Sequence, residues 1–102
     1  MQRDLPILSI ELEAVPADGR PTSFVLEVQK PFFEDEPLWR CVVTMDGFQR
    51  PLRIGGGDPF QALCLAIDFV RSVLADFEKK GGILMSEGER FRLDSYSLTP
   101  PD

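Results

Sequence analysis

A long amphipathic pattern between residues 58 and 80 predicts one helix. Apolar side chains recur there at the three- and four-residue spacing of a single helical face, at Phe60, Leu63, Ile67, Val70, Leu74 and Phe77. A second apolar set widens this face on one side, at Ala62, Ala66, Phe69 and Val73. Because the apolar face is so broad, we expect the helix to pack on a sheet and not to form a coiled coil.

Both ends of this helix carry typical signals. Asp58 suits the N-cap, Pro59 suits the first helical position, and Gln61 completes a capping box. At the other end, two lysines suit the negative pole of the helix dipole, and two glycines follow them as a stop. The helix is therefore the element that the sequence predicts most sharply.

Alternating apolar and polar residues predict four strands before the helix, over residues 8–14, 22–30, 38–45 and 48–54. The inward-facing side chains of the first three should be Leu8, Ile10, Leu12, Ala14, Phe24, Leu26, Val28, Trp39, Cys41, Val43 and Met45. Asp46-Gly47 predicts a two-residue hairpin between the last two strands. Pro51 indicates an edge position or a bulge in the fourth.

After the helix, residues 83–85 and 89–94 fit a short hairpin around Ser86-Glu87-Gly88, with Tyr96 and Leu98 docking the tail. The chain is expected to form a single domain over residues 1–102. Its predicted class is α+β: an antiparallel meander of about four strands with one long helix packed across one face, plus a short C-terminal hairpin or tail. Two placements of residues 82–98, within the sheet or over it, stay open.

Three segments resemble, in their order, a family of small bacterial proteins. These are Trp39-x-Cys41, then Asp46-Gly47, then Gly56-x-Asp58-x-x-Gln61-Ala-Leu at the start of the helix. The resemblance covers about residues 24–75, and it implies a compact α+β fold with no assigned activity. Small acidic domains of this build also resemble the immunity proteins of bacterial toxin systems, by analogy of fold and charge.

The net charge of the chain limits the classes of molecule that it is expected to bind. The formal net charge is −6 over 102 residues, which disfavours nucleic acid because phosphates require a positive surface. No apolar run approaches a membrane span and the N-terminus lacks a signal-peptide pattern, so we expect a cytoplasmic protein without a membrane partner. The two cysteines, Cys41 and Cys64, are expected to be reduced core residues.

Catalytic, cofactor and metal motifs are weak throughout. The chain has no histidine, the commonest general base and metal ligand. The three glycines before Asp58 lack the lysine and hydroxyl residue of a phosphate-binding loop. Consecutive acids at residues 34–36 lack the alternating spacing of a calcium loop. We therefore expect no enzyme activity, no cofactor and no metal.

The connection between the second and third strands is the candidate binding site. It places Phe32 and Phe33 beside Glu34, Asp35 and Glu36, between two prolines. Its simpler interpretation is a solvated acidic loop. Its sharper interpretation is a recognition loop with two aromatic anchors and acidic guides, which gains if both phenylalanines are exposed. Leu65 projects from the polar side of the helix as additional apolar surface.

We hypothesise a non-enzymatic protein-binding module, immunity-like in its use of acidic loops to hold a basic partner. Two alternatives stay open. One is a small-molecule binder or minor enzyme with a pocket between helix and sheet, its polar lining drawn from Tyr96, Arg50 and Arg53. The other is a structural homodimer that pairs edge strands.

Overall fold

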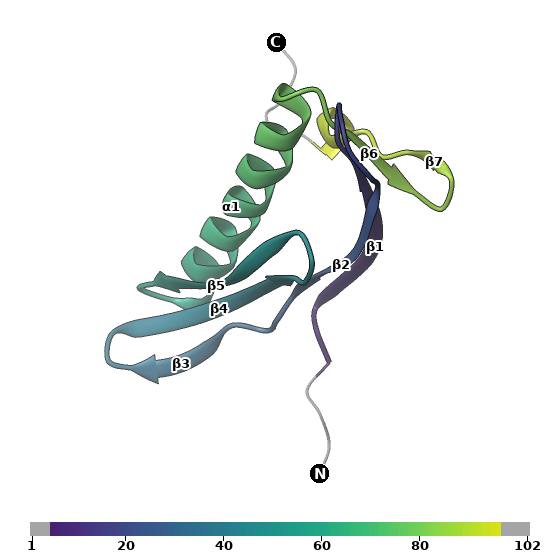
Figure 1. Cartoon of the computed structure of the whole chain (residues 1–102). Helices are drawn as coiled ribbons and strands as arrows, with labels where there is room; N and C mark the ends of the chain where they lie inside the picture. Colours follow the sequence, from purple (N-terminus) through teal and green to yellow (C-terminus); the bar gives the residue numbers. More distant parts are fainter. Residues whose placement is uncertain (1–4, 97–102) are drawn as a thin grey trace.

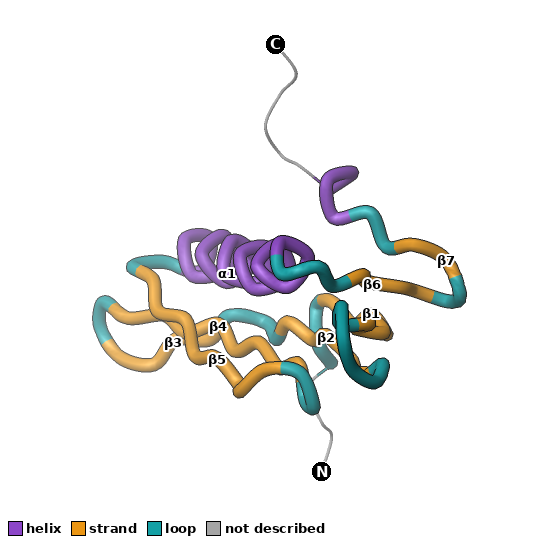
Figure 2. The backbone as a smooth tube through the Cα atoms, turned by 45° about the horizontal axis from the view of Figure 1, so that its top comes forward, coloured by secondary structure: helices purple, strands orange, loops and turns teal. Residues whose placement is uncertain are grey.

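The computed structural model describes residues 5–96 and shows two layers, a twisted antiparallel sheet and one long helix laid across it (Figures 1 and 2). The elements in chain order are β1 (Leu8–Val15), β2 (Thr22–Val28), β3 (Phe32–Asp35), β4 (Leu38–Met45), β5 (Gln49–Gly56), α1 (Pro59–Lys79), β6 (Ile83–Ser86), β7 (Glu89–Arg90) and a short 3-10 turn over Leu93–Tyr96. The α+β class is confirmed. The strand number is not, since the sheet has seven strands where about four were expected.

Strand β4 organises the sheet. On one side it pairs with β5, and on the other it pairs first with β3 and then with β2. Strand β2 pairs with β1, and β6 pairs with only the last three residues of β1 before turning into β7. Residues 83–90 therefore join the sheet as β6 and β7, whereas the turn over Leu93–Tyr96 lies outside the sheet and contacts α1. Leu98 lies outside the described residues. As predicted from Pro51, β5 is an edge strand, and its register shifts opposite Val43 to Met45.

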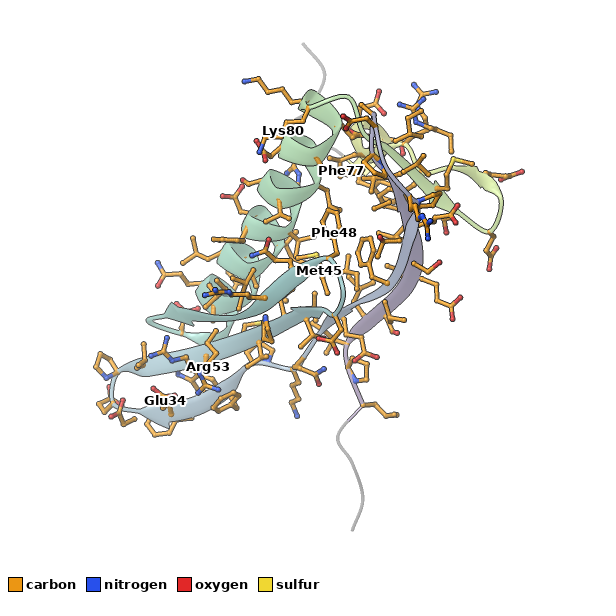
Figure 3. The ribbon with its side chains drawn as sticks, viewed as in Figure 1. Glu34, Met45, Phe48, Arg53, Phe77 and Lys80 are labelled. Carbon is orange, nitrogen blue, oxygen red and sulfur yellow. The ribbon has the colours of Figure 1, made fainter. Side chains whose placement is uncertain are left out.

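The predicted strand faces are confirmed where the helix covers the sheet. Leu12, Ala14, all three inward residues of β2, and Cys41, Val43 and Met45 are buried. Beneath the C-terminal half of the helix, Phe48 stacks on Phe24 with 4.5 Å between ring centroids, and it meets Phe77 of α1 edge-on at 5.3 Å (Figure 3). Phe48 belongs to the hairpin turn itself. The loop holds three residues and not the predicted two, because Met45 pairs with Gln49.

The start of α1 follows the predicted cap. The Asp58 carboxylate accepts a 2.7 Å hydrogen bond from the Gln61 N–H, and the Gln61 side chain accepts one from the Gly57 N–H at 2.6 Å. In a standard capping box the Gln61 side chain would accept its hydrogen bond from the N–H of the N-cap residue, Asp58. Here the donor is the residue before it, Gly57. The helix ends at Lys79, and Gly81 has the positive φ, 93°, expected of the stop. Lys80 lies 2.9 Å from the Asp76 carboxylate.

The predicted apolar face of α1 is confirmed except at Phe60 and Phe69, which are exposed. Its fully covered residues are Ala62, Ala66, Val70 and Leu74, whereas Phe60 is 76% exposed. A Cβ placed on Gly56 would lie only 2.5 Å from the Ala62 nitrogen. The helix backbone therefore approaches the sheet so closely that small residues occupy the contact, and the larger Phe60 points away. No helix among residues 5–96 is both long and apolar enough to span a membrane.

Candidate functional site

The first candidate surface is the β3–β4 hairpin, which Figure 1 shows on the opposite side of the molecule from the β6–β7 hairpin. The sequence predicted a loop over residues 30–37, and this is wrong, because Phe32–Asp35 form strand β3 against β4. All four residues of β3 are exposed. Flanking prolines and consecutive acids are typical of loops. Here these residues form a strand nevertheless, because they pair with β4, the next element of the chain.

The two phenylalanines of the hairpin point to opposite faces, as adjacent strand residues do. Phe32 lies opposite Arg40, and Phe33 lies opposite Trp39, whose ring it meets edge-on with 5.6 Å between centroids. Phe32 is 40% exposed and Phe33 is 52% exposed. Both aromatic side chains are therefore available at the surface, which is the condition under which the recognition interpretation gains.

Glu34 has a structural role that the sequence did not reveal. Its carboxylate lies 3.2 Å from Arg40 Nε and 3.1 Å from an Arg53 guanidinium nitrogen (Figure 3). These contacts join β3, β4 and β5 on one face of the sheet. Glu34 thus braces the hairpin, and its charge is compensated by two arginines. Arg53, predicted as a pocket residue, belongs to this brace instead.

Asp35 and Glu36 supply the remaining negative charge of the hairpin. Both are exposed, and neither forms an ion pair with any other residue between 5 and 96. Asp35 is the last residue of β3 and Glu36 lies in the turn that leads into β4, so both are close in sequence to the two phenylalanines. The hairpin therefore presents one exposed phenylalanine on each face, next to two carboxylates that form no ion pair within residues 5–96.

Leu65 does not join this cluster. It lies on α1, which packs on β4 and β5, and it is 45% exposed. Its predicted exposure is correct, and it lies on the helix, whose main strand contacts are with β4 and β5 and not with β3. The predicted site residues therefore divide into one hairpin cluster and one separate helix position.

The second candidate surface is an apolar cleft of about 220 Å³ between α1, the sheet and the segment 91–96. Its lining is Leu8, Ile10, Leu26, Ile67, Val70, Arg71, Leu74, Phe91, Leu93 and Tyr96. Of the three polar residues predicted for such a pocket, only Tyr96 lines it. The cleft is almost wholly apolar, whereas the small-molecule alternative predicted a partly polar one.

The sequence predicted a pocket between helix and sheet with Tyr96 in its lining, but it did not reveal the apolar residues that form most of the cleft, because those residues carry the pattern of a core. Leu8 and Ile10 alternate in phase with buried Leu12 and Ala14, but Leu8 is 38% exposed. The ring of Tyr96 stacks on Phe91 at 5.1 Å and shields part of this region. Nothing in the periodicity distinguishes an inward residue that the helix covers from one that it leaves open.

The cysteines differ from each other. Cys41 is buried as predicted, and its thiol lies 3.3 Å from the Gln29 carbonyl oxygen, which it approaches as donor. Burial raises the pKa of the Cys41 thiol. Cys64 is exposed on α1, so its predicted place in the core is wrong. Between residues 5 and 96 no three side chains of the metal-binding types converge.

Comparison of the chain with protein-family models, with curated proteins and with solved structures finds no match. We therefore infer function from the geometry and charge of the described residues.

Proposed function

We propose that the chain is a non-enzymatic protein-binding module that holds a basic partner through the β3–β4 hairpin. The observation that carries this proposal is the exposure of both Phe32 and Phe33 beside two uncompensated carboxylates. Aromatic side chains are enriched at the centres of protein interfaces, and charges around them steer the partner and speed association. An immunity-like role in the cytoplasm is one form of this proposal.

Side chains, and not backbone pairing, are the expected means of contact. The outer edge of β3 is short, interrupted by a register shift between Phe33 and Asp35, and acidic. Natural sheets use these same features to prevent strand-to-strand association. We therefore expect the partner to contact both faces of this edge strand, to bury Phe32 on one face and Phe33 on the other, and to place cations near Asp35 and Glu36.

The braced Glu34 supports this arrangement in a second way. Its contacts with Arg40 and Arg53 hold the hairpin to β5. A binding surface held rigid loses less conformational entropy on association than a mobile loop. Glu34 should therefore be left intact in any test of charge recognition, because its replacement would also loosen the hairpin.

The experiment is affinity capture from native lysate at low and high salt, with matched variants as bait. Phe32→Ser/Phe33→Ser removes the exposed aromatic side chain from each face of β3, and Asp35→Asn/Glu36→Gln removes the negative charge of the turn. Val25→Ser and Glu11→Gln/Glu13→Gln are controls, because those residues are also exposed but lie on β1 and β2.

The proposal predicts one stoichiometric basic protein that both hairpin variants lose and both controls retain, with high salt weakening its capture. Equal recovery by hairpin and control variants would remove the hairpin from the interface. Recovery of the bait alone, together with twice the monomer mass at micromolar concentration, would favour the homodimer.

A further inference from the structure

The first half of β1 is an open strand edge. Strand β6 pairs only with residues 13–15 of β1, so no other strand among residues 5–96 lies beside residues 8–11 on that side (Figure 1). The Glu11 carbonyl oxygen points to this edge, because it accepts a 3.3 Å hydrogen bond from Ser86 Oγ. Backbone groups alternate in direction along a strand. The N–H and C=O of Ser9 and the N–H of Glu11 therefore point to the open edge as well.

This edge is regular, whereas the other long edges of the sheet are not. Strands β3 and β5 each contain a register shift, and β5 also contains Pro51. Strand β1 pairs with β2 without a shift from Leu8 to Ala14, and its open part contains no proline. Proteins use register shifts and prolines to keep edge strands from pairing. The open edge of β1 lacks both, so its backbone is suited to accept another strand.

The apolar cleft lies beside this edge. Its β1 residues are Leu8 and Ile10, and its other walls come from α1, β2 and segment 91–96. Its volume of about 220 Å³ holds about seven groups the size of a water molecule, which is enough for about two valine side chains. A strand added to β1 would point every second side chain to the helix side of the sheet. The cleft therefore supplies the side-chain pocket that strand addition uses for specificity.

The opposite face of β1 is acidic. Glu11 and Glu13 point away from the helix there, and Glu27 of β2 lies opposite Ser9, whose hydroxyl donates to it at 3.3 Å. None of the three carboxylates forms an ion pair within residues 5–96, and β1, β2 and β6 contain no lysine or arginine. Opposite charges on adjacent strands are favourable and like charges are not. Basic side chains on an added strand therefore complement this face.

We propose that β1 accepts an extended segment of a partner protein in which apolar and basic residues alternate. The segment lies antiparallel to β1, in line with β6, and forms hydrogen bonds with the open backbone groups of Ser9 and Glu11. Its apolar side chains enter the cleft beside Leu8 and Ile10, and its basic side chains lie near Glu11 and Glu13. A second copy of this chain fits less well, because its own β1 would bring the same carboxylates to this face. The site does not need the β3–β4 hairpin, so either proposal can fail without the other.

The test is fluorescence polarisation of the full chain with a labelled heptapeptide of alternating valine and lysine that has blocked ends. We expect saturable one-to-one binding. Replacing the valines by threonine should weaken binding at least about tenfold, because the hydroxyl groups find no partner in the apolar cleft. Replacing the lysines by glutamate should weaken it at least as much. No saturation by the lysine peptide, or tighter binding of the glutamate peptide, would overturn the proposal.

Two N-methylated forms of the lysine peptide have equal charge and test the backbone contact. In the antiparallel arrangement the lysine N–H groups point to Ser9 and Glu11, and the valine N–H groups point to solvent. Methylation of the lysine backbone nitrogens should therefore abolish binding, whereas methylation of the valine nitrogens should change it by less than about threefold. Equal binding of the two forms, or loss only on methylation of the valines, would overturn the proposal.

Two variants at Ser9 test the same contact from the side of the protein. Ser9→Pro removes the edge N–H and places a ring there, whereas Ser9→Ala keeps the N–H. We expect Ser9→Pro to weaken the lysine peptide at least about tenfold and Ser9→Ala to change it by less than about twofold. Equal affinities would overturn the proposal. So would twice the monomer mass in Ser9→Ala but not in Ser9→Pro, which would assign the edge to a second copy. If Ser9→Pro does not fold, the methylated peptides decide.

Discussion

Two parts of the same apolar sheet face have different covers. Over β4 and β5 the face is sealed, with Cys41 and Val43 fully buried and Gly56 in contact with the backbone of α1. Over the first half of β1 it is open, and Leu8 remains 38% exposed. The same alternation of apolar and polar residues produced both. Alternation therefore determines which way a side chain points, and a second element determines whether anything covers it.

The two covers are built differently. The sealed region depends on close approach of a helix backbone, with alanines at the contact and no side chain on Gly56 to prevent it. The open region depends on separate side chains of segment 91–96, of which Tyr96 is itself exposed. We expect the sealed region to carry most of the stability and the open region to tolerate change.

The largest effect should come from removing volume in the sealed region. Met45 is 1% exposed. Met45→Ala should lower the free energy of unfolding by about 2–5 kcal/mol, because it removes buried apolar contact and leaves a cavity. Urea unfolding measures this. Val25→Ala, on the exposed face of β2, is the control and should change stability by less than about 0.5 kcal/mol.

Adding volume at the same contact should have the next largest effect. Gly56→Ala places a methyl group 2.5 Å from the Ala62 nitrogen, so the helix must move away. We expect a loss of about 1–3 kcal/mol in thermal or urea unfolding. Gly57→Ala is the matched control, because its nearest neighbour is the Gln61 side-chain oxygen at 3.3 Å. Equal losses from the two variants would contradict the close-approach account.

Much of the fold was predictable because it depends on local rules. The cap at Asp58, the inward faces of β1, β2 and β4, the edge position of β5 and the C-terminal hairpin all follow from spacing and turn chemistry. Strand β3 was missed because its flanking prolines and consecutive acids disfavour a strand, although it pairs with β4, the next element of the chain, in a tight hairpin.

The candidate sites were less predictable. Exposure of Phe32 and Phe33 was the condition set for a recognition role of this segment, and both side chains are exposed. The ion pairs of Glu34 with two arginines could not be predicted, because they depend on β3, β4 and β5 lying side by side. The cleft was not predicted with its actual lining, because Arg71 appeared only as a polar helix residue. Its position depends on where segment 91–96 packs beside α1.

Loss of the N-terminal cap of α1 should have a smaller effect on stability. Asp58→Ala removes the acceptor of the Gln61 N–H and should cost about 1 kcal/mol of unfolding free energy. Asp58→Asn should recover most of that loss, since an amide oxygen also accepts the bond. No difference between alanine and asparagine would show that the cap contributes little here.

Replacing the exposed Cys64 should have the smallest effect on stability, and it allows the reactivity of the buried Cys41 to be measured alone. Cys64→Ser should change stability by less than about 0.5 kcal/mol, because that side chain is exposed. The same substitution should abolish rapid labelling of the native protein by a thiol reagent, because Cys41 is then the only cysteine left. Burial shields Cys41 and raises its pKa, so its thiol stays protonated and unreactive. Rapid labelling of Cys41 in folded Cys64→Ser would show that the sealed region opens.

The most direct measurement of the contrast is methyl NMR of the full chain with a soluble paramagnetic reagent, which broadens the resonances of methyl groups that solvent can reach. We predict that the methyl resonances of Leu8 and Ile10 broaden, while those of Val28 and Val43 stay sharp. Equal broadening of both groups, or none in the first, would contradict an open cleft beside a sealed core.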